Sequence, residues 1–469
     1  QIPNDSRYQF SENRRERMNG QAVVQFKPSD ALEITVDGLY ARNKLSDERS
    51  EQTNWFQRPF TSVTFDDNTQ MQSAVILEEA VQADKGYEQQ RFATDTELYS
   101  IGGNLKWNFT DSLSLTLDAN HSKSTTNPDN SNGSSATTIS IGAPVRATHR
   151  VDFTSGFPQQ SETINDCNAT NGGRGGNCNN QLDIGDVGTQ IARTITSEQE
   201  ARINQYGAEF AWDLGEGSRF VFGGDYVDAK MRSATSNTQQ MLGDWGITDT
   251  GLVNQLASDL VKTYCLTCKF DKYDPGSTGS ALVAFRGNAV DLLDVFSPYY
   301  ANSGIAGRGV MNQGNADDTV GEKTWAVYGQ MNWSGDIAGR PASALIGVRY
   351  EQTRVNALAL QSVPAALRWQ SDNDFQVDGG PAGAAVTQKA KYDNLLPSLD
   401  FKIEVLDNVV ARTSFSQTLA RADYGSLFAS VTANAPNRPT ALGAAPAAAS
   451  RQDPGLLPLE SDNFDVSLE

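Results

Sequence analysis

The sequence predicts an all-β chain that forms part of a transmembrane, antiparallel, up-and-down β-barrel. Three observations support this prediction. Apolar and polar residues alternate over long segments, these segments come in pairs joined by short turns, and long connections separate the pairs. Strict alternation gives a strand one apolar and one polar face, which is the arrangement that a barrel wall in lipid requires.

The clearest pair of strands lies between residues 97 and 120. Apolar residues or glycine occupy every second position over 99–109 and again over 113–119, after a break at Thr110 and Asp111. The same pattern is expected in four further pairs and in one last segment, at 18–26 and 32–40, 206–214 and 220–226, 325–333 and 344–350, 399–405 and 409–415, and 464–468. The pattern therefore indicates about eleven strands.

Strand and connection lengths favour a membrane barrel over a soluble β-sandwich, whose buried face is equally apolar. We expect strands of roughly 10–13 residues, because tilted strands of that order cross the hydrocarbon core. The connections between pairs are expected at 44–96, 124–201, 231–321, 356–390 and 420–461. Repeated connections of this length are uncommon in compact domains, whereas barrels have long extracellular loops and short periplasmic turns.

Composition excludes some classes of function. The chain has 57 acidic and 38 basic residues and a net charge of −19, which disfavours a nucleic-acid partner. No catalytic motif is present, so we expect neither an enzyme nor a cofactor. The first residues lack the basic start and apolar stretch of a signal peptide, and we expect any targeting segment to lie upstream.

Four cysteines form two close pairs in polar segments: Cys167 with Cys178, and Cys265 with Cys268. Local disulfides in an oxidising compartment are the main expectation. Free thiols, or a metal or redox site, are the alternatives. A zinc site would need further ligands, and the chain has only two histidines, so we expect no metal site.

Two sets of residues are candidates for ligand contact. Flat aromatic rings in the long connections stack on sugars and on planar chelates, although packing of the loops is an alternative role; these residues are Trp55, Phe56, Trp245, Tyr299, Tyr300 and Trp369. Strand parity places a second, charged set toward the lumen: Glu33, Asp37, Lys106, Glu209, Arg349, Asp400, Lys402 and Arg412.

Several segments match the barrel of one known family. Residues 13–30 are similar to its early hairpin, 326–332 and 347–353 to mid-barrel strands, and 392–412 to the next hairpin. Residues 453–464 are similar to its pattern Asn-Pro-x-Leu-x-Pro-Glu-x-Ser-x-Asn-Tyr. The chain thus resembles the TonB-dependent receptors of bacterial outer membranes, and most of all a subgroup of Caulobacter- and Xanthomonas-like bacteria. Ala422 stands where the family usually has proline, and Leu457 where it usually has lysine.

The resemblance implies that residues 1–469 are the central part of a barrel of about 22 strands, without the N-terminal plug domain or the C-terminal strands. It implies active import of a scarce ligand, a siderophore–iron complex or an oligosaccharide, across the Gram-negative outer membrane. TonB would act through the plug, outer-membrane lipid would surround the wall, and the charged set would contact plug or ligand. A passive porin and a soluble β-rich adhesin or binding module are the alternatives.

Overall fold

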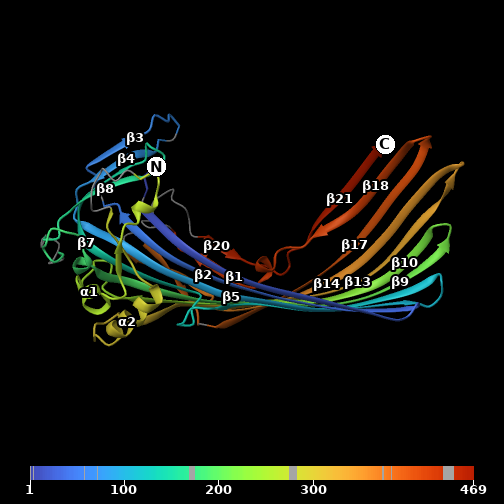
Figure 1. Cartoon of the computed structure of the whole chain (residues 1–469), viewed down its shortest axis with the longest axis horizontal. Helices are drawn as coiled ribbons and strands as arrows, with labels where there is room; N and C mark the ends of the chain where they lie inside the picture. The colour runs from blue at the N-terminus through green and yellow to red at the C-terminus, as the bar shows by residue number, and fades with distance from the viewer. Residues whose placement is uncertain are drawn as a thin grey trace.

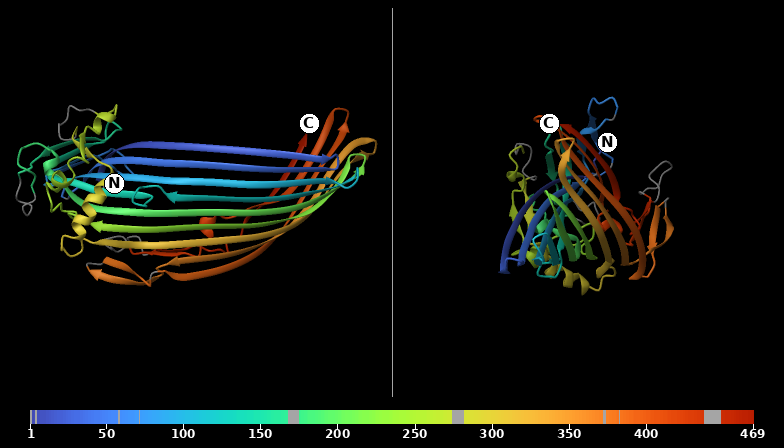
Figure 2. Two further views of the ribbon diagram at one scale, coloured as in Figure 1. Left: turned by 60° about the horizontal axis from the view of Figure 1, so that its bottom comes forward. Right: turned by 90° about the vertical axis from the view of Figure 1, so that its right-hand side faces the viewer.

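The computed structural model describes residues 2–3, 5–57, 59–70, 72–167, 175–273, 282–371, 374–381, 383–436 and 448–469. Within these residues the chain is mostly β-strand and its strand pairs are antiparallel, which confirms the all-β prediction. One long, curved sheet, here called the wall, dominates the molecule (Figure 1). Its strands run side by side along the long axis (Figure 2).

The long strands of the wall follow one another in chain order, each hydrogen-bonded to the next. Each predicted strand lies within one of them: β1 (Asp5–Ser29), β2 (Leu32–Trp55), β5 (Ala83–Asn108), β6 (Leu113–Pro128), β9 (Gly188–Gly215), β10 (Ser218–Met241), β13 (Val310–Ile337), β14 (Arg340–Gln361), β17 (Ala384–Leu406), β18 (Val409–Ala420) and β21 (Leu459–Leu468). The short turns between paired strands gather at one end of the wall (Figure 2). At one of these turns, Gly215 and Gly217 have positive φ angles, which glycine adopts without steric cost.

Most strands are much longer than the sequence predicts. β9 and β13 have 28 residues each, and β5 has 26, against the expected 10–13. Much of the predicted loop sequence, such as residues 44–55 and 231–241, continues the neighbouring strands. The prediction was wrong because it relied on alternation. Where a strand extends out of an apolar environment, both of its faces can be polar. The period-two pattern then disappears, although the backbone hydrogen bonds between strands continue.

One strand of the wall is replaced by another. β6 ends at Pro128, and β7 (Ala136–Asp152) takes its place between β5 and β9. The second half of β7 leaves the wall and pairs with β4 (Ala74–Glu79) and β8 (Gln159–Ile164), while β3 (Ser62–Phe65) pairs with β4. The ladder beside β5 therefore continues past the end of β6.

The end of the wall away from the short turns carries a compact module, here called the cap. It is formed by β3, β4, β7 and β8, together with η1 (Ile184–Asp186), α1 (Leu252–Ala257), β11 (Lys262–Tyr264), η2 (Thr267–Lys269), β12 (Ala284–Arg286) and α2 (Ala289–Ala301). Its hydrophobic core joins Phe285 and Phe296 to Tyr87 and Ile139 of the wall. No helix among the described residues has the length and apolar character needed to span a membrane.

Smaller elements lie near the C-terminal strands. β15 (Pro364–Ser371) pairs with β16 (Asp374–Gly379), and β19 (Val431–Asn434) pairs with β20 (Ala448–Arg451). The 3-10 helix η5 (Tyr424–Leu427) leads into Phe428 and Ala429, which pack against Val320 and Val355 of the wall. This segment covers one face of β13 and β14.

The apolar side chains predicted on alternate positions share one face of the wall, here called the outer face. Strand register places Trp212, Phe220, Met331, Ile346 and Leu399 side by side across β9, β10, β13, β14 and β17. Trp212 and Ile346 are 50% and 57% exposed to solvent. An apolar surface that extends across so many strands suits contact with lipid.

Candidate functional site

The eight charged residues of the predicted lumen set lie on the face opposite to the apolar side chains, here called the inner face. Strand register pairs Glu33 with Lys106, and Lys402 with Arg412. These pairs alternate with apolar residues that project from the outer face. The inner face is therefore a polar surface behind the apolar part of the outer face.

A cavity of about 550 Å³ lies on this inner face, where β2, β5, β6, β9, β10 and β14 contribute side chains. Gly102 and Gly207 line it and present no side chain. A Cβ atom on Gly102 would overlap the Asp37 carboxylate, so glycine leaves room for that carboxylate to lie across the wall. The polar side chains that line the cavity include Asp37, Asn104, Asp118, Gln205, Asp225 and Arg349.

Arg349 is the centre of a hydrogen-bonded network beside this cavity. Its Nη1 donates to Asp225 Oδ2 at 2.7 Å, and its Nε donates to Glu351 Oε2 at 3.3 Å. Its guanidinium lies 5.8 Å from the centre of the Tyr328 ring, and the Tyr328 hydroxyl donates to Glu209 at 2.9 Å. The network thus links two residues of the predicted set, Arg349 and Glu209, and holds the guanidinium in place.

A second cavity, of about 540 Å³, brings together three other residues of the predicted set: Asp400, Lys402 and Arg412. It lies nearer the short turns, and Ser343 and Asp465 also line it. The inner face therefore has two polar hollows, one dominated by carboxylates and amides and one of mixed charge.

Two of the six candidate aromatic residues pack within the protein. Phe56 stacks on His149 with ring centres 5.3 Å apart. Tyr300 is buried in the cap, and its hydroxyl contacts Thr189 and Asp249. Side chains in such contacts pack within the protein, so these contacts favour the packing role for both residues.

The other four aromatic residues are exposed. Trp55 ends β2 on the inner face, where Arg7 lies 5.8 Å from its ring centre. Trp245 is 53% exposed and lines a cavity of about 310 Å³, whereas Tyr299 lies on α2. Trp369 is 61% exposed on β15, in a separate sheet. The aromatic residues therefore do not form a single cluster, and several lie on regular elements instead of the predicted loops.

The cap contains a buried ionic cluster that the sequence analysis did not identify. Lys85 Nζ lies 2.7 Å from Glu162 Oε1, and Arg146 Nη2 lies 2.7 Å from Glu79 Oε1, with all four side chains about 1% exposed. His149 joins the second pair through Glu79, at 3.1 Å. The pairing of β7 with β4, β5 and β8 brings these residues together, and no local sequence pattern predicts that pairing.

Burial and neighbouring charges lower the pKa of both members of the first pair, Lys85 and Glu162. Burial lowers the pKa of the Lys85 ammonium. Burial alone would raise the pKa of Glu162, but the positive charges of Lys85 and Arg146 outweigh it and lower that pKa. Glu162 therefore holds its proton less tightly in the folded cap than in the unfolded chain.

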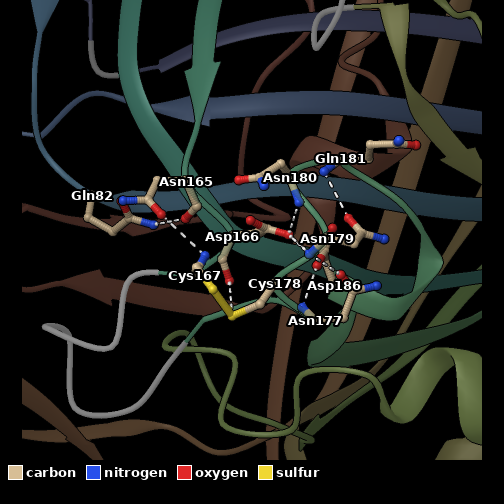
Figure 3. Close-up of a disulfide and its surroundings, with 10 residues drawn as sticks. All are labelled: Gln82, Asn165, Asp166, Cys167, Asn177, Cys178, Asn179, Asn180, Gln181 and Asp186. Carbon is tan, nitrogen blue, oxygen red and sulfur yellow. Dashed lines mark hydrogen bonds between the residues drawn. A yellow bond between two sulfur atoms is a disulfide. The ribbon is translucent and has the colours of Figure 1, made fainter.

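The first cysteine pair is a disulfide within the cap. Figure 3 shows Cys167 bonded to Cys178 beside Asp166. The Asp166 carboxylate accepts hydrogen bonds from the backbone amides of Asn179, at 2.7 Å, and Asn180, at 2.9 Å. The cross-link and this carboxylate together fix the segment that leads into η1.

The second pair, Cys265 and Cys268, is also a disulfide, and Cys268 lies within the 3-10 helix η2. Among the described residues, no group of three or more His, Cys, Asp or Glu side chains is arranged to hold a metal ion.

An apolar outer face, a polar inner face and short turns at one end define a membrane-spanning β-sheet protein. The family model of the TonB dependent receptor-like β-barrel matches residues 32–469, and the chain belongs to this family. It is a family of TonB-dependent transport in the outer membrane of Gram-negative bacteria. No curated protein matches the chain. The Caulobacter- and Xanthomonas-like subgroup stays a prediction.

Proposed function

We propose that this chain forms wall and extracellular cap of a transporter that actively imports a neutral oligosaccharide. The cavity of about 550 Å³ on the inner face is the observation that supports this ligand most directly. Its lining of carboxylates, amides and one guanidinium offers both donors and acceptors, which neighbouring sugar hydroxyls require. A few placed polar groups in a concave site are typical of small-molecule recognition.

Two further features support a neutral ligand over an anionic siderophore–iron complex. The chain has a net charge of −19, and Asp37, Asp118 and Asp225 all line the cavity. A clustered negative charge repels an anionic ligand. Exposed rings, such as those of Trp55 and Trp245, provide flat apolar surfaces for the faces of sugar rings.

Active import needs an energy source, and the outer membrane has no supply of ATP. We propose that TonB provides this energy by mechanical coupling through a plug domain. Binding energy alone would hold a scarce ligand in place without moving it against a gradient. A passive porin would instead let its solute equilibrate.

The ligand class can be tested by titration calorimetry of the whole protein in detergent, with neutral oligosaccharides of two to six units and with an anionic ferric catecholate. We expect binding of an oligosaccharide, weakened about five- to tenfold by Asn104→Ala, because Asn104 hydrogen-bonds to Asp118 at 2.6 Å beside the cavity. Asn127→Ala is the matched control, because residue 127 lies on the outer face of β6. Binding of the ferric catecholate alone would refute the oligosaccharide proposal.

Coupling can be tested separately by uptake of a radiolabelled oligosaccharide into cells with and without TonB. When the oligosaccharide concentration is below the KM of uptake, we expect uptake to require TonB. Uptake that is equal in both strains would identify a passive channel. A protein recovered from cells without detergent would instead identify a soluble binding module.

A further inference from the structure

A row of basic side chains crosses the outer face of the wall beyond its apolar part. On β6, β9 and β10, strand register places Lys123 beside Arg202, and Arg202 beside Lys230. Neighbouring side chains on one face of a sheet lie about 5 Å apart at Cβ, so these three cations are adjacent.

The row continues on the next three strands. Lys323 of β13 pairs with Arg354 of β14, and Arg354 pairs with Lys391 of β17. Asp228 of β10 pairs with Lys323 and joins the two halves. We call the six cations the basic row: Lys123, Arg202, Lys230, Lys323, Arg354 and Lys391.

The basic row lies at the edge of the lipid-facing surface. Lys323 is exposed and lies two residues beyond Trp325, on the same face, whereas Thr324 between them is buried. Arg202 and Lys230 each lie four residues beyond an exposed tyrosine, Tyr206 and Tyr226, toward the long connections. Aromatic side chains mark the interface between membrane and water, so the basic row lies where lipid headgroups lie.

Within the described part of the chain, the row has few anionic partners. Lys123 pairs with Glu200 at 2.9 Å, and Lys323 lies 3.9 Å from Asp228. The other four cations have no ion pair among the described residues, and the buried Nε of Arg202 has no hydrogen-bond partner there. Like charges placed side by side on a sheet are destabilising unless anions lie between them.

We propose that the basic row binds the phosphate groups of anionic lipid headgroups in the leaflet nearer the long connections. Arginine and lysine are the side chains that bind phosphate, and each contributes to attraction toward an anionic membrane surface. The adjoining apolar face distinguishes a lipid from free phosphate, because acyl chains contact that face while the phosphates contact the row. This inference is independent of the identity of the imported ligand.

The cap leaves the row accessible. It packs on the same face of the wall, but farther from the short turns, where Gln240 of β10 donates to the backbone oxygen of Ser297 at 3.0 Å. Gln240 lies ten residues beyond Lys230, which corresponds to about 33 Å along a strand. A strip of the outer face therefore remains open for headgroups between the apolar surface and the cap.

The test uses the whole protein in phosphatidylcholine vesicles that contain spin-labelled phosphatidic acid or spin-labelled phosphatidylcholine. Electron spin resonance gives the preference of the wall for the anionic lipid. We expect the triple variant Lys230→Gln, Arg354→Gln, Lys391→Gln to reduce this preference at least about tenfold. The matched control, Lys106→Gln, Lys402→Gln, Arg412→Gln, removes three cations from the inner face and should leave it unchanged.

Three results would overturn the proposal: an unchanged preference in the triple variant, an equal loss in the control, or competition by inorganic phosphate beyond that of chloride at equal ionic strength. The last result would identify a site for free phosphate. If the triple variant does not insert into the vesicles, the three single variants test the proposal in its place. Their side chains are exposed and unpaired among the described residues, and each should lower the preference at least about twofold.

Discussion

At the scale of single residues, buried charges have the largest expected effect. Glu162→Gln would leave the Lys85 ammonium buried without its carboxylate, and removal of one partner of a buried pair costs about 3–5 kcal/mol. We expect a clear fall in the urea concentration at which half of the cap is unfolded. Limited proteolysis of the whole protein in detergent micelles measures this midpoint. Glu78→Gln is the control, because its pair with Arg150 is about 40% exposed and is worth less than about 1 kcal/mol.

The same carboxylate makes the stability of the cap depend on pH. Since the pKa of Glu162 is lower in the folded protein, its contribution is present above the ordinary glutamate value of about 4.3 and is lost as pH falls through the folded value. We expect the difference in urea midpoint between wild type and Glu162→Gln to be largest near pH 6 and to shrink toward pH 3. A constant difference would show that Glu162 does not titrate in this way.

Two neighbouring glycines offer a matched test of the inner cavity. A methyl group at Gly102 would force the Asp37 carboxylate to rotate, whereas a methyl group at Gly103 would meet nothing within 4 Å. We expect Gly102→Ala to lower oligosaccharide affinity about threefold or more, with stability changed by about 0.5 kcal/mol or less, as for a surface site. Gly103→Ala should leave affinity unchanged. Equal affinities in calorimetry would remove this cavity from the ligand path.

At the scale of elements, the length of the strands is the main departure from expectation. Residues 228–240 are paired in β10 with both β9 and β13, although the sequence suggests a loop from residue 231. We expect their amide protons to exchange slowly, because backbone groups paired on both sides open only with the sheet. Gly304 and Gly307, which are exposed in the segment after α2, should exchange within seconds. Fast exchange over 231–240 would favour the original loop prediction.

The sequence predicts an element only where one face differs from the other. Alternation located each long strand of the wall, and it assigned Glu33 and Arg349 to the inner face through parity. It could not locate the polar extensions or β7, whose partners in the wall, β5 and β9, lie far away in the sequence. The stacking of Phe56 on His149 and the burial of Tyr300 both depend on the cap, so their aromatic character alone could not separate packing from ligand contact.

At the scale of the whole molecule, the two faces of the wall should tolerate charge differently. Val327→Lys would place an ammonium on the exposed apolar face, where a cation costs about 2–4 kcal/mol near the bilayer midplane. Gln330→Lys, three residues along the same strand and on the inner face, should cost little. Urea titration of the whole protein folded into lipid vesicles measures both. Equal effects would mean that the outer face does not contact lipid.

The replacement of β6 by β7 has a consequence for how such a protein can change over evolutionary time. The height of the wall is not limited by the length of any one strand. A later segment can pair with the two neighbouring strands beyond the point where an earlier strand ends. An insertion between two such segments would neither shift the register of β5 and β9 nor expose their edges. Selection could therefore enlarge and diversify the end of the wall away from the short turns while the lipid-facing portion stays the same.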